Sequence, residues 1–222
     1  MHESYKKMES ILSTEYYLQT TDMCHIMKKH GSDKGLGYHN YTTLYHSLFS
    51  SLRDQQVNIL EVGLGTNNPN IPSNMGVNGR PGASLRGWEE YFTHPDTKIV
   101  GLDIDKDILF QTNKIKTFYC DQTNATSIDT VWNSIPEISE FDIIVDDGLH
   151  TYEAGISFLE NSMHKLKKGG IYIVEDLLPD TQFKFQVNLE GLKDKYELSH
   201  VSIVTIPHTA NNIDNCVLLI KK

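Results

Sequence analysis

The sequence is poor in the residues on which several classes of protein depend. Of its 222 residues only three are arginine and three are cysteine, and Asp plus Glu outnumber Lys plus Arg by 29 to 20. The net charge of −9 leaves no basic surface of the kind that binds nucleic acid. Cys24, Cys120 and Cys216 lie too far apart for a metal-binding or redox motif and indicate reduced thiols.

Long hydrophobic runs are also missing. No segment approaches the ~20 apolar residues that span a bilayer, and residues 1–7 lack the apolar stretch of a signal peptide. We therefore expect a cytoplasmic protein with no membrane partner. The length suits a single domain, residues 1–222, although two domains would also fit, and a homo-oligomer is left open.

From residue 57 onward, short apolar runs alternate with amphipathic stretches. They predict strands at residues 58–62, 99–102, 116–120, 141–145, 171–174, 198–206 and 216–220, and helices at residues 84–92, 106–111, 127–132 and 152–166. Five β-α units predict a Rossmann-like α/β fold with helices on both faces of a mostly parallel, seven-stranded sheet. The last two strands, joined by residues 207–212, should pair as an antiparallel hairpin.

Two further segments flank or interrupt this core. Residues 1–53 predict helices, broken by a loop at residues 30–37, that form a cap or lid over the α/β core of residues 54–222. Residues 66–82 are rich in Asn, Pro and Gly, and a loop of this length is usually functional or mobile.

Acidic side chains follow two of the predicted strands. Asp146 and Asp147 come directly after residues 141–145, with His150 three residues beyond Asp147, and Glu175 and Asp176 follow residues 171–174. If these strands are neighbours, the acids meet at the edge where open α/β folds bind ligands. Crowded carboxylates repel one another, and Mg²⁺ would relieve that repulsion. The same acids could serve only as helix caps or turns.

The first strand ends in Gly63 and Gly65, where a ligand can approach the backbone closely. A dinucleotide-binding loop would have a third Gly or Ala at the start of the helix, whereas this chain has Asn68 there. Asp103, at the end of the next strand, is placed to accept hydrogen bonds from ribose hydroxyls. The missing glycine favours S-adenosylmethionine over a nicotinamide cofactor.

A set of motifs gives the chain a resemblance to a known family. The motifs are EVGLG (61–65), GASLR (82–86), GLDI (101–104), DQ (121–122), DDGLH (146–150) and GGIYIVED (169–176), together with HGSDKG (30–35) and the tyrosines at 38, 41 and 45. In this order they resemble the class I S-adenosylmethionine-dependent methyltransferases, and more narrowly the metal-dependent O-methyltransferases of the macrolide-sugar, mycinamicin-type group. The resemblance covers residues 30–178. It implies Mg²⁺-dependent methylation of a hydroxyl on a sugar or glycosylated small molecule.

The resemblance also implies a role for each site residue. The cofactor would contact Glu61, Gly63, Gly65, Ser84, Asp103, Asp121, Gln122 and Asp146, with Ser84 at the methionine carboxylate. The metal would be held by Asp147, Glu175 and Asp176, and His150 would be the general base. Independent chemistry agrees, because a bound cation lowers the pKa of a coordinated hydroxyl and an imidazole with pKa near ~6.5 accepts a proton at neutral pH.

The charge of the predicted metal site bears on the substrate, and two alternative functions stay open. Three carboxylates overcompensate a divalent ion unless the cofactor's sulfonium or a neighbouring lysine balances them, which favours a neutral substrate. One alternative is an NAD(P)-dependent sugar oxidoreductase, although the chain lacks the Tyr-x-x-x-Lys pair of its short-chain form near the fourth or fifth strand. Another is a non-catalytic S-adenosylmethionine-binding subunit. The tyrosines at 38, 41 and 45 predict a packed helix face, or alternatively a lid over the cofactor.

Overall fold

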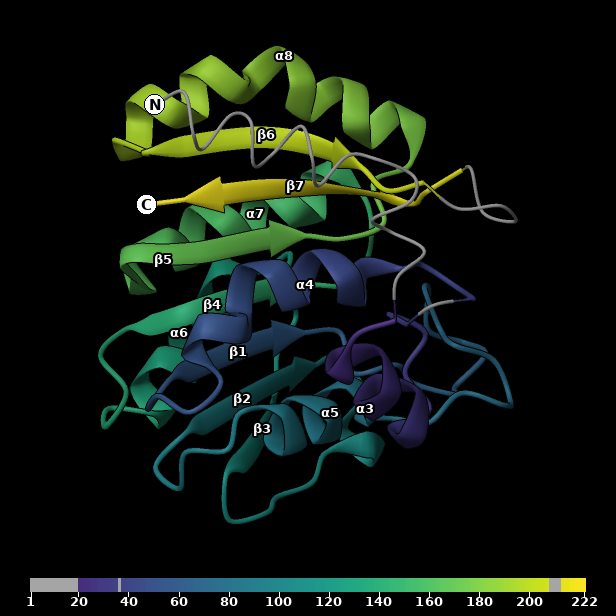
Figure 1. Ribbon diagram of the computed structural model, residues 1–222. Coiled ribbons are helices and arrows are strands. Elements are labelled where there is room, and N and C mark those ends of the chain that lie inside the picture. Colours follow the sequence, from purple (N-terminus) through teal and green to yellow (C-terminus); the bar gives the residue numbers. More distant parts are fainter. Residues whose placement is uncertain (1–19, 36, 208–212) are drawn as a thin grey trace.

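Burial along the strands alternates between two faces of one sheet. In β1 (Asn58–Val62), Leu60 packs toward one face and Ile59 toward the other, as the period of two in a strand requires. The computed structural model describes residues 20–35, 37–207 and 213–222 (Figure 1). Its other strands are β2 (Lys98–Asp103), β3 (Ile115–Tyr119), β4 (Phe141–Asp146), β5 (Leu166–Val174), β6 (His200–Thr205) and β7 (Cys216–Lys221).

The strand order is β3-β2-β1-β4-β5-β7-β6. Strands β1 to β5 pair in parallel, and β7 runs antiparallel to both β5 and β6. The predicted parallel core and C-terminal hairpin are therefore confirmed, although residues 208–212 of the connecting loop lie outside the described residues. Strands β2 and β4 lie on opposite sides of β1, so the direction in which strands are added to the sheet reverses at β1. This reversal creates the switch point where open α/β sheets bind ligands.

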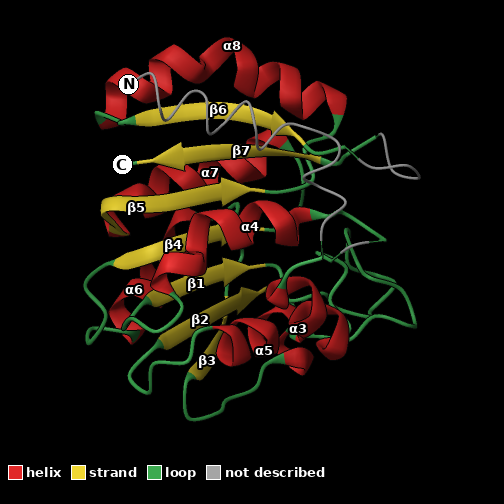
Figure 2. Cartoon of the chain, in the orientation of Figure 1, coloured by secondary structure: helices red, strands yellow, loops and turns green. Residues whose placement is uncertain are grey.

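Helices of the described chain cover both faces (Figure 2). One face carries α3 (Asp22–His30), α4 (Tyr41–Phe49) and α5 (Ala83–Tyr91), whose apolar side chains share a core with Ile59, Ile143 and Ile173. The other carries α6 (Ala125–Ser134), α7 (Tyr152–Ser162) and α8 (Pro179–Tyr196), packed on Leu60, Ile144 and Tyr172. The short 3₁₀ helices are η1 (Ser50–Leu52), η2 (Lys106–Ile108) and η3 (Met163–Lys165).

The N-terminal segment reaches the edge of the sheet because α3 ends sharply. The Thr21 side chain caps its first turn, and Gly31, with φ of 85°, ends it by donating hydrogen bonds to the carbonyls of Met27 and Lys28. The chain then crosses the carboxyl ends of the strands before α4 begins. The predicted helix–loop–helix is thus confirmed for the described part, while residues 1–19 lie outside it and the role of residues 1–53 as a lid stays a prediction.

Two helix predictions need correction. The helix expected at residues 106–111 is only the single turn η2, because the backbone N–H of Phe110 donates to Thr117 Oγ1 and Gln111 bridges to Lys116. The structure also contains α8, which we did not predict. Its apolar residues do not form one stripe, since Phe185 is buried while Phe183 is 66% exposed.

Candidate active site

A cavity of about 620 Å³ opens at the carboxyl edge of the parallel strands. Register explains why the site residues meet there: Asp146, the last residue of β4, pairs with Val62 of β1 and with Val174 of β5. The residues that follow these strands therefore emerge side by side. The cavity is lined by residues 32–34, 62–66, 70–75, 80, 83–84, 103–104, 120–123, 147–150 and 176.

The two predicted glycines are required by close approach of backbone segments. Gly63 has φ of 89°, and a Cβ on it would lie 1.8 Å from the carbonyl oxygen of Asp147. Gly65 has φ of 78°, and a Cβ there would lie 2.1 Å from Met75 Sδ. Both residues line the cavity, and their lack of side chains lets the β1 loop cross the β4 loop.

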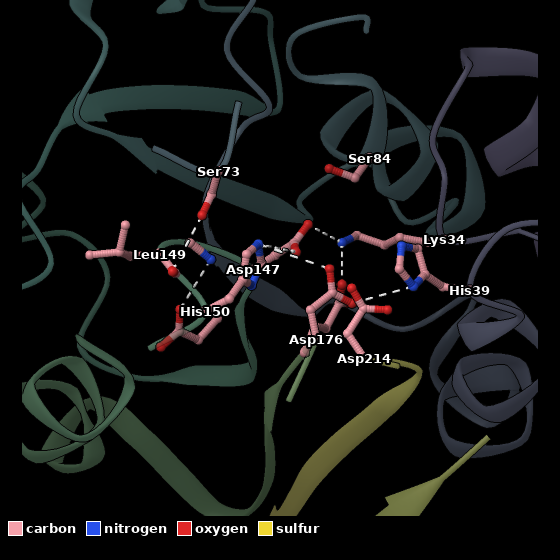
Figure 3. Close-up of polar contacts among 12 residues, drawn as sticks. Lys34, His39, Ser73, Ser84, Asp147, Leu149, His150, Asp176 and Asp214 are labelled. Atoms are coloured by element: carbon pink, nitrogen blue, oxygen red, sulfur yellow. Dashed lines mark hydrogen bonds and ion pairs between the residues drawn. The ribbon is translucent and has the colours of Figure 1, made fainter. Parts of the chain in front are cut away.

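The long loop of residues 66–82 forms one wall of this cavity. The Met75 N–H donates to the Thr66 carbonyl at 2.9 Å, and Asn67 Nδ2 donates to the Gly79 carbonyl at 3.1 Å. Ser73 Oγ reaches across to the Leu149 carbonyl at 3.3 Å (Figure 3). The loop is therefore folded on itself and tied to the segment that carries His150.

Asp103 lines the cavity with its carboxylate fixed by the backbone. Oδ2 accepts from the Leu64 N–H at 2.7 Å, and Oδ1 accepts from the Asp105 N–H at 2.8 Å. Burial raises the pKa of Asp103 above its usual value, and these two hydrogen bonds oppose that effect. The side chain is held in one orientation at the end of β2, where a ribose is expected.

Glu61 does not line the cavity, and its contact with the cofactor stays a prediction. Its side chain is fully buried and accepts hydrogen bonds from Ser84 Oγ at 2.6 Å and from Trp88 Nε1. Burial raises the pKa of Glu61, and Lys34 opposes that shift. Ser84 does line the cavity, but its hydroxyl hydrogen is already directed to Glu61.

Gln122 links the segment after β3 to the β4 loop. Its Nε2 donates to Asp146 Oδ1 at 3.0 Å, and its Oε1 accepts from the Leu149 N–H at 2.8 Å. Asp121 and Gln122 both line the cavity, whereas Asp146 lies behind Gln122 and does not. Burial raises the pKa of Asp146 to about 6.

Asp147, Asp176 and His150 form a group that could share one cation. Their ligand atoms all lie within 4.8 Å of one another, and His150 Nε2 is 4.0 Å from Asp147 Oδ1 and 3.9 Å from Asp176 Oδ2. His150 and Asp176 both adopt left-handed backbone conformations, with φ of 58° and 53°. Such conformations cost energy in residues other than glycine and concentrate at functional sites.

A buried lysine at this site was not identified from the sequence. Lys34 is 1% exposed, and its Nζ lies 2.5 Å from Asp147 Oδ2, 2.6 Å from Glu175 Oε2 and 3.6 Å from Glu61 Oε1. Burial lowers the pKa of Lys34, but the three carboxylates outweigh it and leave the pKa well above its usual value. The chain therefore contains a neighbouring lysine, one of the two balancing charges that the charge argument named.

Glu175 pairs with Lys34 and is not part of the group formed by Asp147, His150 and Asp176. Its Oε2 meets Lys34 and its Oε1 accepts from the Tyr45 hydroxyl. Burial raises the pKa of Glu175, and Lys34 acts against that shift. The metal-binding role expected for Glu175 stays a prediction, since the structure brings Asp147 and Asp176 together with His150 instead.

The tyrosines of α4 pack in the core, and their hydroxyls also contact the acids of the site. Tyr41 and Tyr45 are fully buried, which confirms the packed helix face, and the Tyr41 hydroxyl donates to Asp176 Oδ1 at 2.6 Å. His39 Nδ1 lies 3.4 Å from the same oxygen (Figure 3). Tyr38, by contrast, is 67% exposed. Period alone predicted the packing, but no local pattern reveals hydroxyls aimed at acids 130 or more residues away.

Comparison with known proteins gives sequence relatives that are named as O-methyltransferases. The chain is 32% identical over 67% of its length to an 8-demethyl-8-α-L-rhamnosyl tetracenomycin-C 2′-O-methyltransferase of Streptomyces olivaceus. It is 30% identical over 70% of its length to a mycinamicin VI 2″-O-methyltransferase of Micromonospora griseorubida. It spans only 36% of the length of each of these relatives. No protein-family model matches the chain.

Solved structures agree on the fold. The methyltransferase MycE of the mycinamycin biosynthetic pathway, solved in complex with Mg and SAH, matches 91% of this chain with a TM-score of 0.68 at 24% identity, over 55% of its own length. A ribosomal RNA methyltransferase of Plasmodium falciparum matches 82% of the chain with a TM-score of 0.56 at 16% identity. No helix within the described ranges is long and apolar enough to cross a membrane. The chain has the fold of the class I S-adenosylmethionine-dependent methyltransferases and resembles, in sequence and in structure, the macrolide-sugar O-methyltransferases.

Proposed function

We propose that this chain is an S-adenosylmethionine-dependent and divalent-metal-dependent O-methyltransferase that acts on a hydroxyl of a sugar or a glycosylated small molecule. One observation carries the proposal: Gly63, Gly65 and Asp103 share a single cavity with the group of Asp147, His150 and Asp176. A methyl-donor site and a cation site would thus open on one space. The relatives named as sugar O-methyltransferases support the substrate class.

The residues present fit a divalent cation. Two carboxylates within reach of one ion supply the oxygen ligands that Mg²⁺ or Mn²⁺ prefers, and the imidazole of His150 lies beside them. Asp147 and Asp176 would hold the ion, and Glu175 would join them if it exchanged Lys34 for the metal. When bound, the cation would lower the pKa of a substrate hydroxyl that coordinates it.

The remaining residues would bind and orient the reactants. S-adenosylmethionine supplies the methyl group; Asp103 would hold its ribose, Asp121 and Gln122 would lie beside its adenine, and the loop of Gly63 and Gly65 would contact its methionine part. His150 would take the hydroxyl proton at Nε2, the nitrogen that faces the two acids. Placing the oxygen in line with the methyl group would supply much of the rate gain.

The test is methyl transfer from labelled S-adenosylmethionine to a panel of sugars, nucleotide sugars and glycosides. Activity should disappear in EDTA and return with Mg²⁺, and Asp147→Ala should abolish it with little change in cofactor affinity. Full activity in EDTA would reject the metal dependence. A non-catalytic binding subunit would transfer no methyl group to any member of the panel, and its function would be indifferent to Asp147→Ala.

Cofactor binding is tested separately by calorimetry. S-adenosylhomocysteine should bind without metal, because the Asp103 side of the cavity is distinct from the acid group. Asp103→Ala should weaken this binding by roughly 1 to 3 kcal/mol, since it leaves polar groups of the ligand unpaired. Tight binding of NADH with no binding of S-adenosylmethionine would favour the oxidoreductase instead.

A further inference from the structure

Two residues of opposite charge in the cavity lining form no hydrogen bond or ion pair through their side chains with any described residue. Asp33 and Arg80 both line the cavity, and in the part of the chain that the structure describes neither side chain has a hydrogen-bond or ion-pair partner. The other lysine or arginine in the lining, Lys34, is occupied by Asp147 and Glu175. Arg80 is therefore the lining cation that remains available to a ligand.

Packing places the Arg80 side chain beside the segment that carries Asp33. The stem of Arg80 lies against Gly31, two residues before Asp33: a Cβ on Gly31 would lie only 2.6 Å from Arg80 Cδ. Arg80 also stands at the start of α5, where its carbonyl accepts from the Ala83 N–H at 3.0 Å. Asp33 and Arg80 thus line the same cavity as Ser84, the residue expected at the methionine carboxylate.

Ser84 alone is poorly suited to hold that carboxylate. Its Oγ donates to Glu61 Oε1 at 2.6 Å, so its single hydroxyl hydrogen is committed inside the protein. A carboxylate beside Ser84 would face an oxygen lone pair and the nearby negative charge of Glu61. A guanidinium, with several donors in a planar fork, matches a carboxylate in geometry and in charge.

We propose that Arg80 binds the α-carboxylate of S-adenosylmethionine and that Asp33 binds its α-ammonium group. The amino-acid end of the cofactor carries one charge of each sign, and the cavity lining offers the complementary pair. The inference rests on the proposed function, because it presumes that S-adenosylmethionine occupies the cavity. It gives a role to Asp33, which lies in the HGSDKG motif (30–35) but had no assigned function, and to Arg80, which no motif includes.

The test compares two ligands that differ at this end. S-adenosylhomocysteine carries the amino-acid group, whereas 5′-methylthioadenosine has a methyl group in its place. By calorimetry, Arg80→Gln and Asp33→Asn should each weaken S-adenosylhomocysteine binding by about tenfold, the loss expected for a hydrogen bond to a charged group. Binding of 5′-methylthioadenosine should change by less than about twofold, as for a surface substitution without partners.

Two controls carry the same charge changes elsewhere. Arg53→Gln removes a cation that pairs with exposed Asp22, and Asp54→Asn removes an exposed anion; both should leave both affinities unchanged. Equal losses for the two ligands would assign Arg80 and Asp33 a structural role, and unchanged affinity for S-adenosylhomocysteine would overturn the pair while leaving the proposed function standing. If the wild-type chain binds 5′-methylthioadenosine but not S-adenosylhomocysteine, or binds neither, the proposed function fails as well.

Discussion

Removing Lys34 should destabilise the protein severely. Its ammonium is buried and contacts Asp147 and Glu175, with Glu61 at 3.6 Å, so Lys34→Met leaves three carboxylates without their cation. Breaking a buried ion pair from one side typically costs about 3 to 5 kcal/mol, because the surviving charge stays buried and unpaired. We expect a loss of this size in the free energy of unfolding, which is a large share of the ~5 to 15 kcal/mol of a typical domain.

The measurement is urea unfolding in EDTA, so that no divalent ion replaces the lysine. Lys29→Met is the matched control, since Lys29 makes a 2.7 Å pair with Glu90 but is 63% exposed, and it should cost less than about 1 kcal/mol. The double variant Lys34→Met/Glu175→Gln should recover part of the loss, because it removes one uncompensated charge together with the lysine.

The pH dependence provides a second check on the same reasoning. Burial raises the pKa of Glu175, so protonation of this carboxyl favours the folded state and its contribution is lost as pH rises. The penalty of Lys34→Met should therefore shrink as pH falls, since a neutral carboxyl needs no cation. A loss no greater than that of Lys29→Met, or a loss independent of pH, would refute the charge-pairing argument.

Three further predictions concern neighbouring groups. His150→Ala should lower kcat by about 10²- to 10⁴-fold with unchanged affinity for Mg²⁺ and S-adenosylhomocysteine; a loss of Mg²⁺ affinity in calorimetry would make His150 a ligand instead. Burial raises the pKa of Asp146 from 3.8 to about 6, so Asp146→Asn should stabilise the protein in urea at pH 8, by on the order of 1 to 3 kcal/mol, and have little effect at pH 4. The three cysteines are buried, and burial raises the pKa of Cys120 to about 12, so all three thiols should react with Ellman's reagent only after unfolding; a thiol that reacts rapidly in the native protein contradicts this.

Much of the fold could be predicted because a strand that is buried on both faces appears in the sequence as a short run of apolar residues. The run at Phe141–Asp146 is buried on both faces, as a central parallel strand requires, and the acid that ends it marks the carboxyl edge. The helix α8 could not be predicted in the same way, because Phe183 and Val187 are exposed and obscure its amphipathic pattern. Its one local signal was Pro179 at the helix start.

The site was predictable only where it follows the ends of strands. Asp147 directly follows β4, and Asp176 lies two residues after the end of β5. Parallel pairing of β4 and β5 is therefore enough to bring the two acids together. Lys34 lies 113 residues from Asp147 in sequence, and its burial depends on how the segment after α3 crosses the sheet edge. The same holds for Tyr45 and Glu175. Long-range polar contacts of this kind have no period and no fixed spacing, which is why sequence patterns do not reveal them.

The charges clustered around Lys34 and His150 also predict which substrates are accepted. Glu61, Asp147, Glu175 and Asp176 carry four formal negative charges, and Lys34 supplies one positive charge, so three negative charges remain. A divalent cation and the sulfonium of S-adenosylmethionine together contribute three positive charges, which brings the group to neutrality. An anionic substrate would add a negative charge that nothing balances, and like charges brought together at a binding site cost several kcal/mol. A neutral glycoside should therefore be methylated with a kcat/KM at least about tenfold higher than that of its uronic-acid counterpart, measured at saturating S-adenosylmethionine and Mg²⁺. Equal kcat/KM for the two would show that the substrate hydroxyl does not experience this charge balance.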